Sequence, residues 1–174
     1  MPSLTTVTIR TARLELVPLR VADAEQMVGV LADPALYAVI GGEPPTLAEL
    51  RDRYVHQVVG RSPDGHEIWA NWVVRERSAG RTVIGFVQAT IAEDGRNAEV
   101  AWLIGVPWQG RGYASEAATG LVTRLGREGI PTIVAHIHPD HVASAGVARA
   151  AGLAPTEAFI EGERVWRWSA RPQA

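Results

Sequence analysis

One stretch, residues 100–118, constrains the fold of this chain more than any other. Residues 100–104 form an uninterrupted apolar run, which is typical of a strand covered on both faces. From Ser115 onward the sequence has the Ala, Leu and Glu content of a helix, and Gly110 and Gly112 lie between the two segments. A helix start leaves its first backbone N–H groups free to bind an anion at the positive end of the helix dipole. The stretch therefore predicts a phosphate-binding turn.

Two other interpretations of the glycines stay open at this point. Gly110 and Gly112 could form a tight turn that binds nothing. The spacing Gly110-x-Gly112-x-x-Ser115 also differs from the dinucleotide-binding fingerprint only at its third glycine. That fingerprint belongs to a fold with several successive strand–helix–strand units, so the rest of the chain must decide.

Composition excludes several kinds of site and partner. The 174 residues include 17 Lys and Arg and 19 Asp and Glu, so a net charge of −2 gives no overall attraction to nucleic acid or anionic lipid. The absence of cysteine excludes disulfides, thiolate metal ligands and a cysteine nucleophile. The sequence shows no signal-peptide pattern and no apolar run of membrane-spanning length. We expect a soluble cytoplasmic protein with one domain, residues 1–174, in which residues 1–10 form a loose N-terminal arm.

Hydrophobic periodicity predicts a mixed α+β fold. Thr46 and Glu49 have the spacing of a capping box at a helix start. We expect helices at residues 21–31, 46–58, 115–127 and 143–151, and strands at residues 14–17, 68–74, 82–91, 98–104, 132–137, 153–160 and 163–168. The three strands within residues 68–104 form an antiparallel meander, and only one crossover follows, which makes one parallel pair in mid-sheet. A single crossover argues against the dinucleotide fold.

The sequence resembles the GNAT family of N-acetyltransferases at its acetyl-CoA motif. The motif residues are Ala98-Glu99-Val100-Ala101-Trp102-Leu103 and Gln109-Gly110-Arg111-Gly112-Tyr113-Ala114. The branch with the most similar motif is the RimJ/RimL-type, the ribosomal-protein N-terminal acetyltransferases. Leu14-Glu15-Leu16 and residues 135–153 resemble the opening and the second motif of the family, so nearly the whole chain is covered. The resemblance implies a mostly antiparallel sheet with helices on both faces and a central parallel strand pair that splays apart around acetyl-CoA.

The resemblance also implies roles for single residues. Leu103 and Ile104 would offer backbone groups to the pantetheine arm, and backbone N–H groups of residues 109–114 would bind the pyrophosphate. Arg111 is then a phosphate partner, although a solvated charge is the alternative. The residues expected to bind the cofactor are Leu103, Ile104, Gln109, Gly110, Arg111, Gly112, Tyr113, Ala114, His141 and Ser144.

Two residues are candidates for the chemistry. Glu99 is the candidate base for the attacking amine, because its apolar neighbours would favour uptake of a proton; alternatively it pairs with an arginine or ends a strand edge. The second motif lacks the tyrosine that many relatives use to protonate the leaving thiolate, so Ser144 is the candidate proton donor. Alternatively, Ser144 is only a helix-start residue. His141 stands where the family usually has asparagine, and its imidazole either replaces the hydrogen bond of that amide or loses it.

The remaining polar and aromatic residues are less specific. His136 and His138 alternate along a strand near Asp140 and His141, which suggests a metal site, but the cofactor motif explains the same stretch and we expect no metal. Trp69, Trp72 and Trp108 either pack in the core or line an acceptor pocket.

We expect a transferase that moves an acetyl group from acetyl-CoA to a primary amine, either a protein N-terminus or a small molecule, by direct attack. A non-catalytic acyl-CoA-binding sensor is the alternative. No nucleic acid or membrane partner is expected, and a homodimer is left open.

Overall fold

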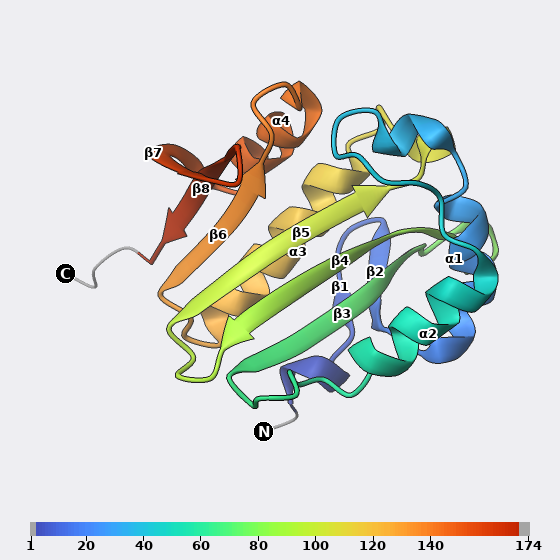
Figure 1. The fold of residues 1–174 in the computed structure, drawn as a ribbon, viewed down its shortest axis with the longest axis horizontal. Coiled ribbons are helices and arrows are strands. Elements are labelled where there is room, and N and C mark those ends of the chain that lie inside the picture. Colours follow the sequence, from blue (N-terminus) through green and yellow to red (C-terminus); the bar gives the residue numbers. More distant parts are fainter. Residues whose placement is uncertain (1–2, 171–174) are drawn as a thin grey trace.

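The computed structural model describes residues 3–170, which form one eight-stranded sheet with the strand order β1-β2-β3-β4-β5-β6-β8-β7 (Figure 1). The strands are β1 (Ile9–Arg10), β2 (Leu14–Pro18), β3 (Glu67–Glu76), β4 (Val83–Ala92), β5 (Asn97–Ile104), β6 (Thr132–Ile137), β7 (Ala154–Ile160) and β8 (Glu163–Ser169). The helices are α1 (Ala24–Val30), α2 (Leu47–Gln57), α3 (Tyr113–Arg127) and α4 (Val142–Ala150). Short 3-10 turns lie at Leu4–Thr6, Val21–Asp23, Pro34–Tyr37, Ala79–Arg81 and Val106–Trp108.

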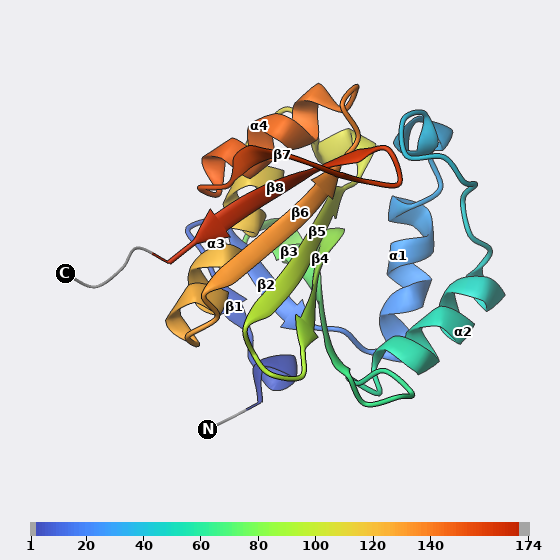
Figure 2. The same ribbon diagram turned by 60° about the vertical axis from the view of Figure 1, so that its left-hand side comes forward.

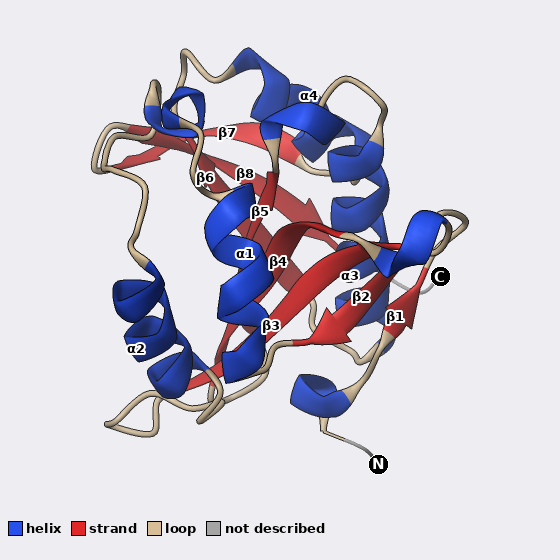
Figure 3. Ribbon diagram, turned by 90° about the vertical axis from the view of Figure 1, so that its right-hand side faces the viewer, coloured by secondary structure: helices blue, strands red, loops and turns tan. Residues whose placement is uncertain are grey.

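The helices cover both faces of the sheet, as expected. Helices α1 and α2 lie on one face and α3 and α4 on the other (Figures 2 and 3). Because side chains alternate along a strand, neighbouring residues of β3 enter different cores: Trp72 packs on the α3 side and Val73 on the α1 side. The sheet is therefore the middle layer of three.

The central parallel pair is splayed. Strands β5 and β6 pair only at Asn97–Thr132, Ala98–Ile133 and Glu99–Val134. Beyond these positions β5 runs on to Ile104 and β6 to Ile137 without pairing to each other. The remaining strand pairs of the described residues are antiparallel, so the predicted fold class is confirmed.

Helix starts follow the local sequence signals. Thr46 Oγ1 accepts the backbone N–H of Glu49 at 3.2 Å, and the Glu49 carboxylate accepts the Thr46 N–H at 3.1 Å, which completes the predicted capping box. Asp33 accepts the N–H of Ala35 at 2.9 Å and starts the 3-10 turn Pro34–Tyr37. Helix α3 begins at Tyr113, two residues before the predicted start, directly after the glycine turn.

Part of the segment predicted to be a loose arm is ordered. Ile9 and Arg10 form β1 and pair with Leu16 and Glu15 of β2. Ile9 is buried and Leu4 packs against the same core, so apolar burial fixes this segment to the sheet. Residues 1 and 2 lie outside the described part of the chain. No helix within residues 3–170 is long and apolar enough to cross a membrane.

Candidate active site

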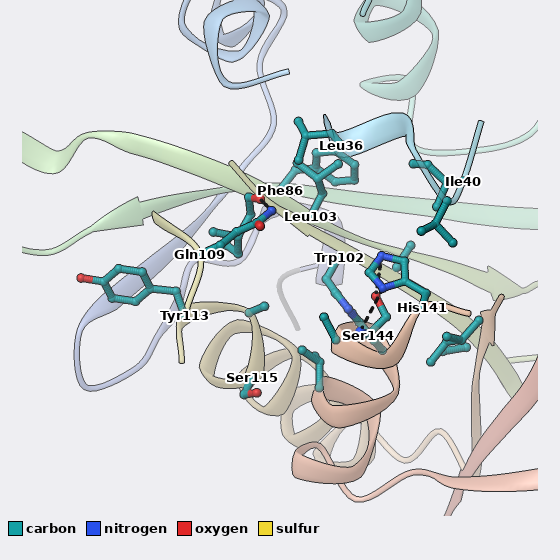
Figure 4. Close-up of a pocket in the computed structure, with 18 of the residues that line it drawn as sticks. Leu36, Ile40, Phe86, Trp102, Leu103, Gln109, Tyr113, Ser115, His141 and Ser144 are labelled. Carbon is teal, nitrogen blue, oxygen red and sulfur yellow. Dashed lines mark hydrogen bonds between the residues drawn. The ribbon is translucent and has the colours of Figure 1, made fainter. Parts of the chain in front are cut away.

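A cavity of about 630 Å³ lies where β5 and β6 separate. One end of the cavity is lined by the glycine turn and the first residues of α3, and the other by apolar side chains from the 34–40 segment and β4. Leu36, Phe86 and Leu103 lie together on one side, and His141 and Ser144 lie together at the start of α4 (Figure 4). The splay thus gives one continuous space with a polar end and an apolar end.

The glycine turn presents free backbone donors to this cavity. Gly110 and Gly112 have φ values of 76° and 80°, which other residues adopt at a cost. The first helical hydrogen bond runs from the Glu116 N–H to the Gly112 oxygen at 3.0 Å. Within residues 3–170, no acceptor is placed for the N–H groups of residues 110–114. A β-carbon at Gly110 would meet no atom within 4 Å, so the turn borders open space. This geometry suits a phosphate group.

Gln109 connects the glycine turn to the residues that precede it through two hydrogen bonds. Its backbone N–H donates to the Val106 oxygen at 3.2 Å, and its side-chain amide donates to the Ile104 oxygen at 2.9 Å. Two groups that the sequence assigned to the cofactor, the Gln109 N–H and the Ile104 carbonyl, therefore already have protein partners. The donors that stay free begin at Gly110.

Arg13 and Glu116 stabilise the turn, and no local sequence pattern predicts a role for either residue. Arg13 Nε donates to the Glu116 carboxylate at 2.7 Å, and Arg13 Nη1 donates to the Arg111 oxygen at 3.0 Å. The backbone N–H of Arg13 and the hydroxyl of Thr11 donate to the same carboxylate at 2.7 and 2.5 Å. The turn between β1 and β2 thus holds the glycine turn and the first turn of α3 together.

These contacts set the charge state of Glu116. Burial alone would raise the pKa of its carboxyl, but the hydrogen bonds from Thr11 and Arg13 and the Arg13 charge outweigh burial and lower the pKa below its ordinary value. Arg13 also lies over the Tyr113 ring, 4.4 Å from its centroid, and the Tyr113 hydroxyl contacts Glu76 at 3.4 Å. The Arg111 side chain is exposed.

His141 caps α4 and contacts Ser144 twice. Its Nδ1 accepts the Ser144 N–H at 3.2 Å, so the imidazole takes the capping role that asparagine often has. Its Nε2 lies 3.3 Å from Ser144 Oγ (Figure 4). Since Nδ1 accepts, the proton of the neutral ring is on Nε2 and points to the serine oxygen, which leaves the serine hydrogen free to donate elsewhere.

Glu99 is the last residue of β5 that pairs with β6. Its neighbours Ala98 and Val100 are buried in the core that contains α3, so the Glu99 side chain lies on the α1 side of the sheet. Its side chain is 51% exposed, more than its apolar neighbours in sequence suggested, and its Oε1 lies 3.2 Å from His136 Nδ1. Within the described residues, no three His, Cys, Asp or Glu side chains are placed to hold a metal ion together.

The three tryptophans proposed for an acceptor pocket separate into two groups. Trp72 is fully buried and donates to the Val7 oxygen at 2.8 Å, and the Trp69 indole donates to Glu67 at 3.0 Å. Only Trp108 of the three lines the cavity. The apolar end is instead lined by Leu36, Val39 and Ile40 of the 34–40 segment and by Phe86 of β4. The sequence did not predict these residues, because the 34–40 segment carries no recognisable motif.

The chain has a family match and similar solved structures. Residues 13–154 match the family model described as an acetyltransferase (GNAT) domain. A putative ribosomal-protein-serine acetyltransferase from Vibrio cholerae has 20% sequence identity and a TM-score of 0.73, with 94% of this chain and 98% of that one covered.

Two further structures carry ligands in their descriptions. RimL, a ribosomal L7/L12 alpha-N-protein acetyltransferase in complex with coenzyme A, has 15% identity and a TM-score of 0.75, with coverage of 94% and 98%. The microcin C7 self-immunity acetyltransferase MccE, in complex with acetyl-CoA and AMP, has 14% identity and a TM-score of 0.75, with coverage of 92% and 94%. At these identities the likeness shows the fold. No curated protein matches the sequence.

Proposed function

Because the chain belongs to the GNAT acetyltransferases over residues 13–154, we propose that it transfers an acetyl group from acetyl-CoA to a primary amine and acts as a single N-acetyltransferase domain. The observation that carries the proposal is the splay of β5 and β6, which ends at a turn with free backbone donors. The open edge of β5 leads to the anion-binding turn, which suits an elongated ligand with a phosphate group at one end.

The cavity fits coenzyme A in chemistry and direction. The N–H groups of residues 110–114 would bind the pyrophosphate, with the exposed Arg111 side chain near enough in sequence to assist. The edge of β5 beyond Glu99 has no partner on β6, so a pantetheine arm can take the place of the missing strand. The sulfur end of the arm then lies toward the point where the strands separate.

The reaction needs a neutral amine, a polarised thioester and a stabilised leaving thiolate. We place the thioester carbonyl near the backbone N–H groups of Trp102 or Leu103, which would stabilise the oxyanion that forms on attack. The Ser144 hydroxyl, which accepts from His141, has its own hydrogen available for the thiolate. Glu99 lies on the face of the sheet opposite to α3 and α4, which is the acceptor side in this proposal.

The acceptor enters from the apolar end in this proposal. Leu36, Ile40 and Phe86 would contact the apolar part of the acceptor, and its amine would lie over β5. The descriptions of similar structures name ribosomal protein among the acceptors of relatives, so we propose a peptide N-terminus or a small amine with an apolar substituent.

Thiol release tests the proposal. Purified protein is mixed with acetyl-CoA and a panel of peptides and small amines, and free coenzyme A is measured over time. Acceptor-dependent release supports an enzyme, whereas tight binding of acetyl-CoA without release on any acceptor supports the acyl-CoA sensor. Stabilisation of the fold by a nicotinamide dinucleotide and not by coenzyme A would contradict both.

A further inference from the structure

We propose that His136 accepts the proton of the acceptor amine and that Glu99 is the residue that positions it, an assignment that rests on the proposed function. The sequence alone suggests Glu99 itself as the proton acceptor. The placement of the two side chains relative to the cavity carries the new assignment.

The register of the parallel pair places His136 at the point of separation. Glu99 pairs with Val134, and no later position of β6 pairs with β5. Ile133, Ala135 and Ile137 are buried in the core that contains α3, so the alternate residues Val134 and His136 face the acceptor side. His136 is thus the first residue on that side after the strands part.

His136 contacts Glu99 and also lines the cavity. His136 Nδ1 is 3.2 Å from Glu99 Oε1, and the imidazole side chain is 21% exposed against 51% for the carboxylate. Of these two described residues, His136 lines the cavity and Glu99 does not. An amine in the cavity therefore meets the ring before it meets the carboxylate.

The contact selects the form of the ring that can act as a base. A carboxylate beside Nδ1 favours the tautomer with the proton on Nδ1, which leaves the lone pair of Nε2 free. Imidazole is the side chain best matched to proton transfer near neutral pH. Other charged or titratable groups near this face are Glu163 and Arg167 of β8 and His138, the residue after β6. Glu163 adds an acidic group, Arg167 a basic group and His138 a second imidazole.

The step balances in protons and electrons. The ammonium form of the acceptor gives one proton to His136 Nε2. The lone pair of the amine then forms the C–N bond, and the C–S bond breaks with its electron pair on sulfur. The second proton lost by the nitrogen ends on the thiolate, and His136 returns its proton to solvent.

A double-mutant cycle tests the assignment. We expect His136→Gln to lower kcat/KM for the amine by about 10²- to 10⁴-fold, with unchanged affinity for coenzyme A. We expect Glu99→Gln to cost about 10- to 100-fold alone and nothing further in the His136→Gln background, because Glu99 acts through the ring. His66→Gln is the matched control, since His66 Nδ1 lies 3.4 Å from Glu93 outside the cavity, and it should behave as wild type.

Two results would overturn the assignment. One is full activity of His136→Gln, and the other is an equal cost of Glu99→Gln with and without His136, which would make Glu99 the direct base. A wild type that releases no thiol with any amine refutes the proposed function instead.

A spectroscopic readout needs no acceptor. In ¹⁵N spectra of the imidazoles, the signal that His136→Gln removes should show a neutral ring protonated on Nδ1, and Glu99→Gln should shift it toward the other tautomer. A ring protonated on Nε2 in the wild type would contradict the pairing whatever the turnover.

Discussion

The backbone N–H of Ser144 donates to His141 Nδ1 at 3.2 Å, and His141 Nε2 lies 3.3 Å from the hydroxyl of the same serine. One imidazole therefore caps α4 and directs the Ser144 oxygen. The first contact concerns stability and the second concerns chemistry, so substitutions can separate them.

The capping contact predicts a difference between two substitutions of His141. His141→Ala removes the acceptor for the Ser144 N–H and should lower the free energy of unfolding by about 0.5–2 kcal/mol. His141→Asn supplies another acceptor at the cap and should stay within about 0.5 kcal/mol of wild type. Urea denaturation measures both, and equal stability of the two variants would show that the cap contributes nothing.

The second contact predicts a catalytic role for Ser144. Ser144→Ala removes the hydroxyl proposed to donate to the leaving thiolate. Because a hydrogen bond to a charged group contributes about 1.5–3 kcal/mol, we expect kcat to fall by about 10- to 100-fold. Affinity for coenzyme A in its thiol form should change less than kcat does.

Steady-state kinetics and equilibrium titration give these two quantities. Ser169→Ala, at the exposed end of β8, is the control for serine removal. A normal kcat in Ser144→Ala would remove Ser144 from the mechanism and leave it as a helix-start residue.

Glu116 predicts a pH dependence of stability. Despite burial, the pKa of its carboxyl is lowered in the folded protein below the ordinary value of a glutamate, by the hydrogen bonds from Thr11 and Arg13 and by the Arg13 charge. The ionised carboxylate therefore stabilises the fold above that value, and the contribution is lost as the pH falls through the lower folded pKa. Wild type should lose stability in this acidic window more steeply than Glu116→Gln, which has no proton to take up. Denaturant midpoints of the two proteins from about pH 3 to about pH 7 measure the difference, and parallel curves would argue against it.

The sequence predicted the parts of the site that depend on neighbours in the chain. The glycine turn, the start of α3 and the capping box at Thr46 are local patterns, and the single crossover follows from the order of elements. These features appear in the structure within a few residues of their predicted bounds.

The parts that could not be predicted depend on contacts across the chain. Arg13 and Glu116 are 103 positions apart, and each reads as an ordinary surface charge until the fold joins them. The approach of Glu99 to His136 depends on the register of β5 against β6, and a shift of one residue would reverse the faces of a whole strand. Side-chain alternation alone could not place Trp72 in the core rather than the cavity.

In the proposed function the turn before α3 binds the pyrophosphate of acetyl-CoA, and the affinity for coenzyme A of a variant with a negative charge in this turn tests the assignment. Gly112→Asp places a carboxylate beside the free N–H groups, at a residue with a φ of 80° where a β-carbon would also lie 3.4 Å from Arg13 Nη2. Gly162→Asp imposes the same backbone strain at a φ of 82° in the β7–β8 turn, where a β-carbon meets nothing within 4 Å. Calorimetric titration with coenzyme A should show at least about a tenfold weaker affinity for Gly112→Asp and an unchanged one for Gly162→Asp, since about 1.4 kcal/mol corresponds to that factor. Equal affinity of Gly112→Asp and wild type for coenzyme A would show that the pyrophosphate does not bind at this turn.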